Sequence, residues 1–558
     1  MALRAERGAG DGRAALGRAR FVGLACALFA AAAAVATWPA LRHANESFLA
    51  RAAPGYGQAA PGDHLQTGYN LWLVGHQLGR GDAPWRDPYS FQPEADRVAN
   101  LLGWLFGLPY WPLDAAFGPI VAWNLFVLLS YVLAGGAACA WLRELGVGRI
   151  AAVAGGLAFA LAPYRVAQST GHLLGPISAL LPVALWAFER SLARAAPSRW
   201  LVLGGAALTA IPLSGQVHLA LGAIPFFAAY ALVRTRRRTQ LVGAGVGALA
   251  AIAAGLLVRE LAIAGSISSG GRSLGAVRFY SADWADLVSR HVREGLEQFV
   301  FLGWITPLVA LAGLAALLGA RRLGLGLLLA LGALVPILLA LGTNLPTYEL
   351  LWNSLPPFRY PRVPERLMPI ACLALAALVA FAIARIRIDL VAQSHKGILF
   401  AALAVGVLVV DLRVELYGSA GADERNAAYA ALRRAPSGRL LELPVFRPDL
   451  HYGSVYLHYA AQAPRERPGG YSTVAPRPAD RVARQLRGLG CGAWTRGREH
   501  LLAELGVRYV AVHGGLYAAT SYVRAVCEPK ARRALVAHGF RELARDGSVT
   551  LYERRSAG

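Results

Sequence analysis

The sequence predicts a polytopic α-helical membrane protein with about eleven transmembrane helices and a C-terminal extracytoplasmic α/β domain. Three observations support this fold class. Hydrophobic residues make up 56% of the 558 residues and charged residues only 16%, whereas soluble domains carry about 25% charged residues. The apolar residues fall in blocks of about 20, the length that crosses a hydrocarbon core of about 30 Å. After residue 412 this pattern gives way to short strand-like and helix-like segments.

The formal net charge of +23 raises the question of a nucleic-acid partner. The arginines sit mostly at the ends of the apolar blocks, which is the placement that the positive-inside rule describes for cytoplasmic loops. We therefore expect membrane lipid and no nucleic acid among the partners.

The chain opens with a basic segment, residues 1–20, which carries five arginines ahead of the first apolar block, Phe21–Leu41. The charge favours a cytoplasmic N-terminus. A cleaved signal peptide is the alternative, but the block is long for that role and many more apolar blocks follow. We expect an uncleaved first helix.

The remaining apolar blocks extend the predicted transmembrane domain to residues 21–412. Two of them, beginning at Ile150 and Trp200, are short for a full crossing, so the span count holds to within about two. The blocks are Pro119–Leu142, Ile150–Pro163, Pro176–Leu192, Trp200–Gly215, Val217–Val233, Leu241–Ile263, Phe299–Ala320, Leu323–Leu341, Leu367–Ile383 and Ile398–Leu412.

Loop charges give the topology. An alternating path places the short Arg-rich loops, including Arg236–Arg238, in the cytoplasm. The chain after Leu412 then lies outside, so residues 413–558 form the extracytoplasmic domain. The sequence thus predicts a multi-pass protein of the inner (plasma) membrane with a cytoplasmic N-terminus.

The first outside loop, residues 42–118, is long enough to have structure of its own. Leu65–Leu78 has the pattern of a helix, and Asn100–Phe117 is rich in Trp and Leu but interrupted by Pro109 and Pro112. Such a segment suits a helix lying in the membrane interface. The alternative, a twelfth span, would reverse the downstream topology and place the basic loops outside.

The tail reads as a small α/β domain. Asp546-Gly547 favours a two-residue hairpin turn between two strands. Predicted strands are Arg439–Phe446, Arg508–His513, Phe540–Arg545 and Ser548–Glu553, and predicted helices are Asp480–Leu489, Glu499–Leu505 and Tyr522–His538.

Cysteine usage bears on the tail as well. Cys491 and Cys527 fall on the side predicted to be oxidising, where they could form a disulfide or remain free. The other three cysteines lie in apolar blocks, where they pack as small hydrophobic residues.

Motifs of soluble enzymes are missing from the sequence. It has no phosphate-binding glycine loop followed by Lys-Ser/Thr, no metal-type cysteine pair and no His-Glu-x-x-His. The segment Gly62-Asp63-His64 instead places a carboxylate just outside the first span, at the start of a predicted helix. Asp63 either serves as a general base for a hydroxyl acceptor or caps the helix, since Asp is a preferred N-cap.

Two further polar clusters lie on outside loops. Tyr164-Arg165, Gln168 and Gly171-His172 occupy the turn after the third span. The Pro-stiffened loop before the tenth span carries three arginines that could clamp a lipid-linked phosphate: Arg359, Arg362 and Arg366. The alternative for this loop is a solvated segment with interfacial arginine anchors.

These features together resemble the GT-C superfamily of polyprenyl-phosphate-sugar-dependent glycosyltransferases, especially its bacterial members. The matching elements are the Asp63 loop, the interfacial segment before Trp123-Asn124, Tyr164-Arg165 with Gly171-His172, the Arg359–Arg362 loop and the extracytoplasmic α/β tail. The resemblance implies that Asp63 is the catalytic base. Many members carry a second acidic residue beside it, where this sequence has His64, so a divalent metal is possible but not specified. Asp87 is a possible second carboxylate from the same loop.

The resemblance implies that a sugar moves from a polyprenyl-phosphate carrier to a cell-envelope acceptor at the outer membrane face. Asp63 takes the acceptor proton. Arg359, Arg362, Arg366 and Arg165 bind the lipid phosphate, and His64, His172, Gln168 and Asp87 line the cavity. Two alternatives remain open: a non-catalytic GT-C-like assembly protein, and a lipid or sugar transporter. A transporter would carry ionisable residues deep within its helices, whereas the charges here cluster at helix ends.

Overall fold

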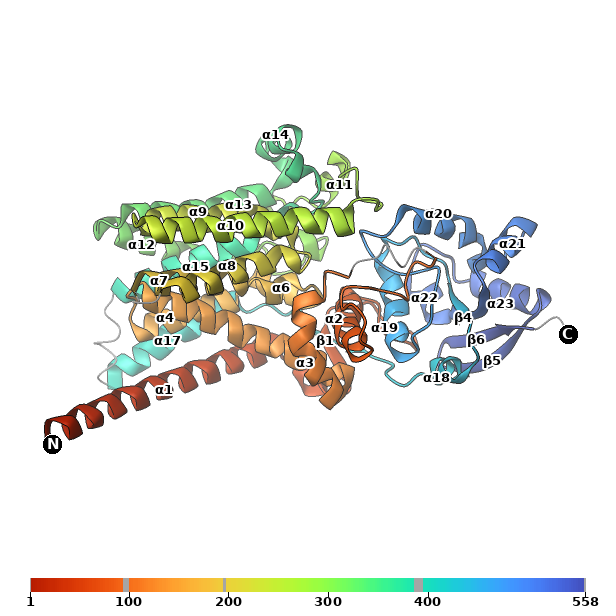
Figure 1. Cartoon of the computed structure of the whole chain (residues 1–558), viewed down its shortest axis with the longest axis horizontal. Coiled ribbons are helices and arrows are strands. Elements are labelled where there is room, and N and C mark those ends of the chain that lie inside the picture. Colours follow the sequence, from red (N-terminus) through yellow and green to blue (C-terminus); the bar gives the residue numbers. More distant parts are fainter. Residues whose placement is uncertain (1, 94–99, 194–196, 386–394, 556–558) are drawn as a thin grey trace.

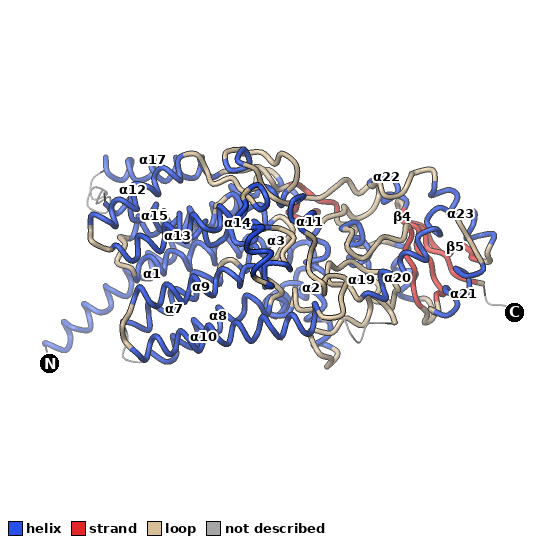
Figure 2. The backbone as a smooth tube through the Cα atoms, turned by 90° about the horizontal axis from the view of Figure 1, so that it is seen from above, coloured by secondary structure: helices blue, strands red, loops and turns tan. Residues whose placement is uncertain are grey.

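The computed structural model describes residues 2–93, 100–193, 197–385 and 395–555. Long helices run side by side along the long axis of the molecule, and the C-terminal part forms a separate mass at one end (Figure 1). The two chain termini lie at opposite ends of this axis. The view from above shows the same division, with strands concentrated in the C-terminal part (Figure 2).

Every predicted apolar block forms a helix of the bundle. The bundle helices are α1 (Ala2–Thr37), α3 (Trp104–Glu144), α4 (Arg149–Ala160), α7 (Leu180–Ala193), α8 (Pro197–Leu213), α9 (Val217–Arg234), α10 (Arg238–Val258), α12 (Ile305–Gly319), α13 (Leu323–Ala340), α15 (Met368–Arg385) and α17 (His395–Leu412). Shorter helices, α5 (Pro163–Ser169), α6 (Leu174–Ile177), α11 (Leu274–Phe279) and α14 (Pro346–Ser354), connect them on the side of the tail.

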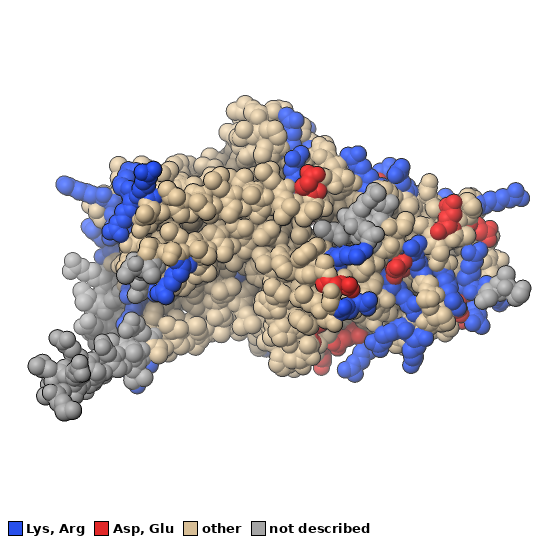
Figure 3. Space-filling model, viewed as in Figure 1, with Lys and Arg blue, Asp and Glu red and all other residues tan. Residues whose placement is uncertain are grey.

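Six helices of the described chain are long and apolar enough to cross a membrane, or seven if α4 and α5, bent by 50° at their break, form one span. On one face, Lys and Arg gather at the bundle end away from the tail, and the middle of the bundle shows a broad uncharged surface (Figure 3). The protein is therefore an integral membrane protein. Helices α7, α8 and α12 are shorter, and α17 counts as a short apolar helix over Ala402–Leu412, so the larger predicted number of crossings stays a prediction.

The predicted interfacial segment is continuous with the second span in α3. Gly118 interrupts this helix with φ 75° and ψ 170°, a backbone conformation that favours glycine because a Cβ would clash there. The segment of α3 before Gly118 turns away from the bundle axis toward α2 (Asp63–Gly79) (Figure 1).

The tail contains a four-stranded sheet in the order β3-β4-β6-β5, with β3 parallel to β4 and the other pairs antiparallel. Its strands are β3 (Arg439–Leu443), β4 (Val507–His513), β5 (Phe540–Asp546) and β6 (Val549–Arg554), which confirms the four predicted strands within a few residues. Helices α20 (Arg477–Leu486), α21 (Arg496–Glu504) and α23 (Cys527–Ala537) match the predicted helices. Three further helices were not predicted: α18 (Ala427–Arg434), α19 (Ser454–Gln462) and α22 (Gly514–Ala519).

The tail is joined to the first outside loop by backbone pairing and packing. Strand β1 (Ser47–Ala50) of the loop pairs antiparallel with β2 (Gly418–Gly421) at the start of the tail. Helix α2 packs against α19, and one hydrophobic core runs without interruption from the bundle into the tail. These contacts fix the tail beside the end of the bundle, where the candidate site lies.

Candidate active site

Helix α2 begins at Asp63, and its N-cap is Gly62, which has an extended backbone and makes no side-chain capping bond. Asp63 therefore does not cap the helix, which argues against the simpler of the two sequence interpretations. Its position in the first turn still favours a negative charge, because the N-terminal end of a helix carries a partial positive charge.

The Asp63 carboxylate is held by two side chains from distant parts of the sequence. Tyr471 donates its hydroxyl to Oδ1 at 2.9 Å, and His172 Nε2 lies 2.9 Å from Oδ2. Burial alone raises the pKa of Asp63, but the charge and hydrogen bond of His172 and the hydrogen bond of Tyr471 outweigh burial and hold that pKa below its usual value. The carboxylate is therefore ionised at neutral pH.

His172 links Asp63 to an arginine through Gln168. Gln168 Oε1 lies 2.8 Å from His172 Nδ1 and accepts a hydrogen bond of 2.6 Å from Arg366 Nη1. Since Arg366 only donates, the oxygen of the Gln168 amide must face it. Both ring nitrogens of His172 then face oxygen atoms, those of Asp63 and Gln168, while Gln168 Nε2 is buried without a hydrogen-bond partner among the described residues.

Three arginines concentrate positive charge on the side of the site toward α9. Arg366 is the arginine that bonds Gln168, and Arg362 lies over the Tyr280 ring with 5.0 Å between its guanidinium carbon and the ring centroid. Arg272 donates through Nη2 to the carbonyl of Thr473 at 3.1 Å. Burial, together with the charge of Arg362, lowers the pKa of Arg272. The cluster thus suits a polyanionic group, since arginine recognises phosphate oxygens with charge-assisted bonds.

A cavity of about 140 Å³, partly open to solvent, lies beside this network. The cavity is lined by Arg272, by His218 of α9 and by Tyr471, which holds Asp63. Gln66, one turn after Asp63 on α2, also lines it and donates to the Tyr471 carbonyl at 2.9 Å. The cavity is therefore lined by the tyrosine that holds Asp63 and by one arginine of the cluster, Arg272.

Asp87 lines this cavity but is engaged in local structure. Its Oδ1 accepts the Tyr69 hydroxyl at 2.9 Å and the backbone N–H groups of Tyr89 at 2.9 Å and Ser90 at 3.2 Å. These bonds hold a turn of the first outside loop.

Two of the predicted phosphate-binding arginines are occupied elsewhere. The Arg165 side chain is fully buried, donates to the carbonyls of Ala160 at 3.0 Å and Ser130 at 2.7 Å, and ties α5 to α3 and α4. Arg359 donates to the carbonyls of Trp352 and Asn353 at the end of α14. In this structure Arg165 does not reach the cavity, and the Arg359 side chain serves the end of a helix.

His64 points away from Asp63, into a second cavity of about 290 Å³ on the other face of α2. Phe48, Trp72 and Trp123 line that cavity with it. Both ring nitrogens of His64 are buried without a hydrogen-bond partner in the described part of the chain, and burial lowers the pKa of His64 to about 3. His64 is therefore neutral and does not extend the Asp63 site.

The residues do not fit a protein-bound metal at Asp63. Among the described residues, no group of three or more His, Cys, Asp and Glu side chains is placed to hold a metal ion. Both oxygens of Asp63 already accept hydrogen bonds, and the adjacent His64 faces the other cavity.

Sequence reasoning missed Tyr471 and Arg272. Tyr471 is the partner of Asp63 from 408 positions along the chain, and no local pattern marks it. Arg272 follows Gly270-Gly271 on an outside loop, and a basic residue after a flexible pair was the available signal. Its backbone N–H donates to the Arg359 carbonyl at 2.7 Å, so the predicted arginine loop does position a phosphate-binding candidate.

Comparisons with known proteins support the fold. No protein-family model matches the chain, and no curated protein matches it. The arabinofuranosyltransferase AftD from Mycobacteria aligns with TM-score 0.59 and 17% identity over 96% of this chain and 40% of its own. An oligosaccharyltransferase from Archaeoglobus fulgidus, tethered to an acceptor peptide, aligns with TM-score 0.52 and 12% identity over 96% of this chain and 74% of its own.

A third structure, AglB from Archaeoglobus fulgidus with an inhibitory peptide and a dolichol-phosphate, aligns with TM-score 0.51 and 13% identity over 97% of this chain and 75% of its own. The chain spans about 40% of the length of AftD. At these identities the likeness concerns the fold. The chain shares the fold of these transferases, in agreement with the fold that the sequence resemblance predicted.

Proposed function

We propose that this protein is a glycosyltransferase that moves a sugar from a polyprenyl-phosphate carrier to a hydroxyl acceptor of the cell envelope, on the extracytoplasmic face of the plasma membrane. The observation that carries the proposal is the ionised Asp63 carboxylate, held by His172 and by Tyr471, where Tyr471 lines a cavity that is also lined by Arg272 of the arginine cluster. The GT-C-like fold supports it, and the structure of AglB with dolichol-phosphate supports a polyprenyl-phosphate donor.

In the proposed reaction the acceptor hydroxyl attacks the anomeric carbon of the donor sugar. The new C–O bond forms as the bond between that carbon and the carrier phosphate breaks, and the phosphate leaves with the bonding electron pair. Asp63 takes the hydroxyl proton. Each of its oxygens accepts one hydrogen bond here and keeps a second lone pair for this role.

The low pKa of Asp63 makes it a weak base toward a free alcohol. Proton transfer therefore accompanies attack, when the hydroxyl oxygen gains positive charge and its proton becomes more acidic. Arg272, Arg362 and Arg366 stabilise the charge that develops on the departing phosphate, the interaction through which a preorganised site lowers a barrier most.

The test is Asp63→Asn in membranes supplied with a panel of polyprenyl-phosphate-linked hexoses and pentoses, with release of free polyprenyl phosphate as the readout. The amide keeps the shape of the side chain but cannot take a proton, so release should fall by about 10²–10⁴-fold. The matched control is Asp82→Asn, which changes an exposed carboxylate just beyond the other end of α2 that pairs with Arg80. It should leave release unchanged.

Abundance in the membrane and thermal stability are measured for both variants. If Asp63→Asn protein of normal abundance retains wild-type release, the proposal fails. Wild-type protein that releases no carrier phosphate from any donor of the panel would favour a non-catalytic assembly role.

A further inference from the structure

The tail contains a large hollow that the proposed reaction does not use. It is an open groove of about 850 Å³ between the loop that follows β3, the end of α20 and the segment that leads into α23. We call it the tail groove. Its walls carry the arginines Arg447, Arg484, Arg487, Arg498 and Arg524. Asp449 is the acidic residue among its described lining residues, so the groove has a strongly positive balance.

Two of these arginines are neutralised by neighbouring acids. Arg484 contacts Asp480 at 2.6 Å, and Arg447 lies 3.5 Å from both Asp480 and Asp449. Their contribution to binding an anion is therefore reduced.

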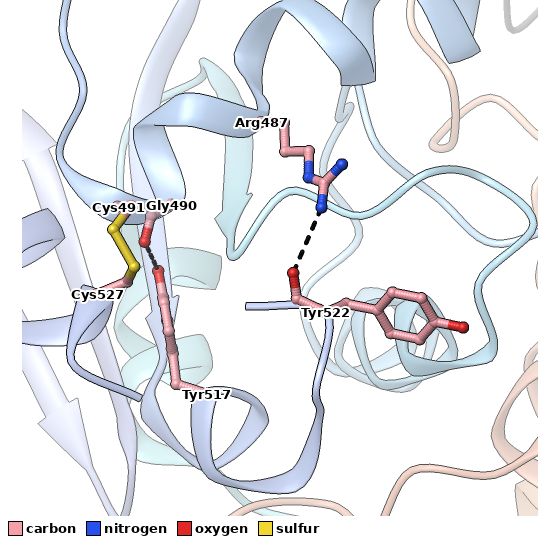
Figure 4. Close-up of a disulfide and its surroundings, with 6 residues drawn as sticks. All are labelled: Arg487, Gly490, Cys491, Tyr517, Tyr522 and Cys527. Atoms are coloured by element: carbon pink, nitrogen blue, oxygen red, sulfur yellow. Dashed lines mark hydrogen bonds between the residues drawn. A yellow bond between two sulfur atoms is a disulfide. The ribbon is translucent and has the colours of Figure 1, made fainter. Parts of the chain in front are cut away.

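The other three arginines have no carboxylate partner within 4.0 Å among the described residues. Arg487 donates through Nη2 to the carbonyl of Tyr522 at 3.4 Å (Figure 4). Arg498 donates to two further backbone carbonyls, and Arg524 is exposed. Like charges held in one groove repel each other, and a bound anion relieves this repulsion.

Backbone packing and a disulfide hold in place the part of the tail groove that carries Arg487 and Arg498. The Arg498 guanidinium packs directly on Gly488. A Cβ added at Gly488 would lie 2.6 Å from Cζ of Arg498. The disulfide between Cys491 and Cys527, with 4.3 Å between the Cα atoms, ties the end of the Arg487–Cys491 turn to α23 (Figure 4). The arginines are therefore presented on a braced surface, which reduces the entropy lost when they bind.

Aromatic rings stand beside the charges. The Tyr522 ring is 51% exposed at the groove, whereas Phe446 on the opposite loop is buried against Tyr452 and Tyr456 and only supports the groove wall. Ring faces of this kind pack on the apolar faces of sugar rings, and guanidinium groups bind carboxylate or phosphate with paired hydrogen bonds. Together they match a saccharide that bears acidic groups.

The tail groove also leads toward the Asp63 cavity. The carbonyl of Pro448, within the groove loop, accepts a hydrogen bond of 2.8 Å from the N–H of Ser472, next to Tyr471. Tyr522 and Asp449 are close enough to act electrostatically on Tyr280 and Arg272 of the arginine side of the site. A saccharide chain bound in the tail groove would thus have one end directed toward Asp63.

We infer that the tail groove binds an acidic glycan, a saccharide chain that carries carboxylate or phosphate groups, and that this glycan is the acceptor. The identification as acceptor rests on the proposed function. The binding of an acidic glycan does not.

The test measures binding of a short oligogalacturonate to the full-length protein in nanodiscs of zwitterionic lipid, with a maltooligosaccharide of equal length as the neutral probe. The variant Arg487→Ala/Arg524→Ala removes two unpaired groove charges. The matched control, Arg433→Ala/Arg434→Ala, removes the same charge from the exposed end of α18. The groove variant should raise the Kd for oligogalacturonate about tenfold at low salt, and added salt should shrink the difference.

The inference predicts that oligogalacturonate binds more tightly than the neutral probe, and that the control variant binds it like wild type. Equal affinity for both probes, or equal weakening in both variants, would overturn it. An effect of the groove variant that appears only in nanodiscs containing anionic lipid would assign the surface to lipid headgroups and also overturn it. Asp63→Asn protein should bind oligogalacturonate normally, so a failure of the proposed reaction is distinguishable from a failure of the groove.

Discussion

Replacing His172 tests how the site holds its carboxylate. In the structure His172 contacts Asp63 at 2.9 Å and Gln168 at 2.8 Å. We expect His172→Ala to leave the Asp63 carboxylate intact but to remove the charge and the hydrogen bond that His172 supplies to it. His172 is thus a positioning residue in the proposed mechanism.

The magnitude follows from the exposure of the pair. A charge-assisted hydrogen bond contributes about 1.5–3 kcal/mol. The side chains are 29% exposed for Asp63 and 18% for His172, so solvent screens part of this interaction. A loss of about 1–2 kcal/mol remains, which corresponds to a decrease of about 5- to 30-fold in kcat.

The pH profile separates this role from a merely structural one. His172 holds the pKa of Asp63 down, whereas burial raises it. Without His172 the Asp63 pKa rises, the carboxylate is protonated at a higher pH, and the acidic limb of the activity profile should move to higher pH.

The free energy of unfolding should also depend on pH through the pair of Asp63 and His172. A carboxylate with a depressed folded pKa contributes stability above its unfolded pKa of about 4, and this contribution is lost as pH falls through the folded pKa. The difference in unfolding free energy between wild type and His172→Ala should therefore be full at neutral pH and shrink below about pH 4.

The assay is release of polyprenyl phosphate against pH, with chemical unfolding of the same preparations. His172→Gln, which restores a neutral donor, should recover part of kcat without restoring the acidic limb. His500→Ala, at an exposed histidine of α21, is the control and should change neither. An acidic limb that stays in place in His172→Ala would refute the reasoning.

Three further outcomes are expected. Arg272→Ala should raise the KM for the polyprenyl-phosphate donor about tenfold, the loss of one charge-assisted contact, and an unchanged donor KM would remove Arg272 from the phosphate site. Alkylation of unreduced protein, mapped by mass spectrometry, should leave Cys491 and Cys527 unlabelled, and Cys491→Ala should cost about 4 kcal/mol of unfolding free energy through lost loop closure. Two labelled thiols would contradict the bridge. Reporter fusions after Arg238 should score cytoplasmic and those after Tyr417 extracytoplasmic, and the reverse pattern would overturn the predicted topology.

The sequence by itself determined the bundle helices and the strands of the tail sheet, but not helices α18, α19 and α22. Apolar block length gave every bundle helix, and the Asp546-Gly547 turn gave the β5–β6 hairpin, because helix and hairpin formation depend on patterns within a few residues. It also singled out Asp63 and the pair Cys491 and Cys527. It placed Arg165 in the site, although burial turns that side chain into the bundle.

Only the tertiary structure decided what surrounds Asp63. Its partners His172 and Tyr471 lie 109 and 408 positions away, and β1 finds β2 across most of the chain. Such partners are chosen by long-range packing, which brings the tail against the first outside loop, and no local periodicity records it. The capping interpretation of Asp63 failed for the same reason, since a carboxylate with distant donors in reach has no need of the N–H groups of its own helix.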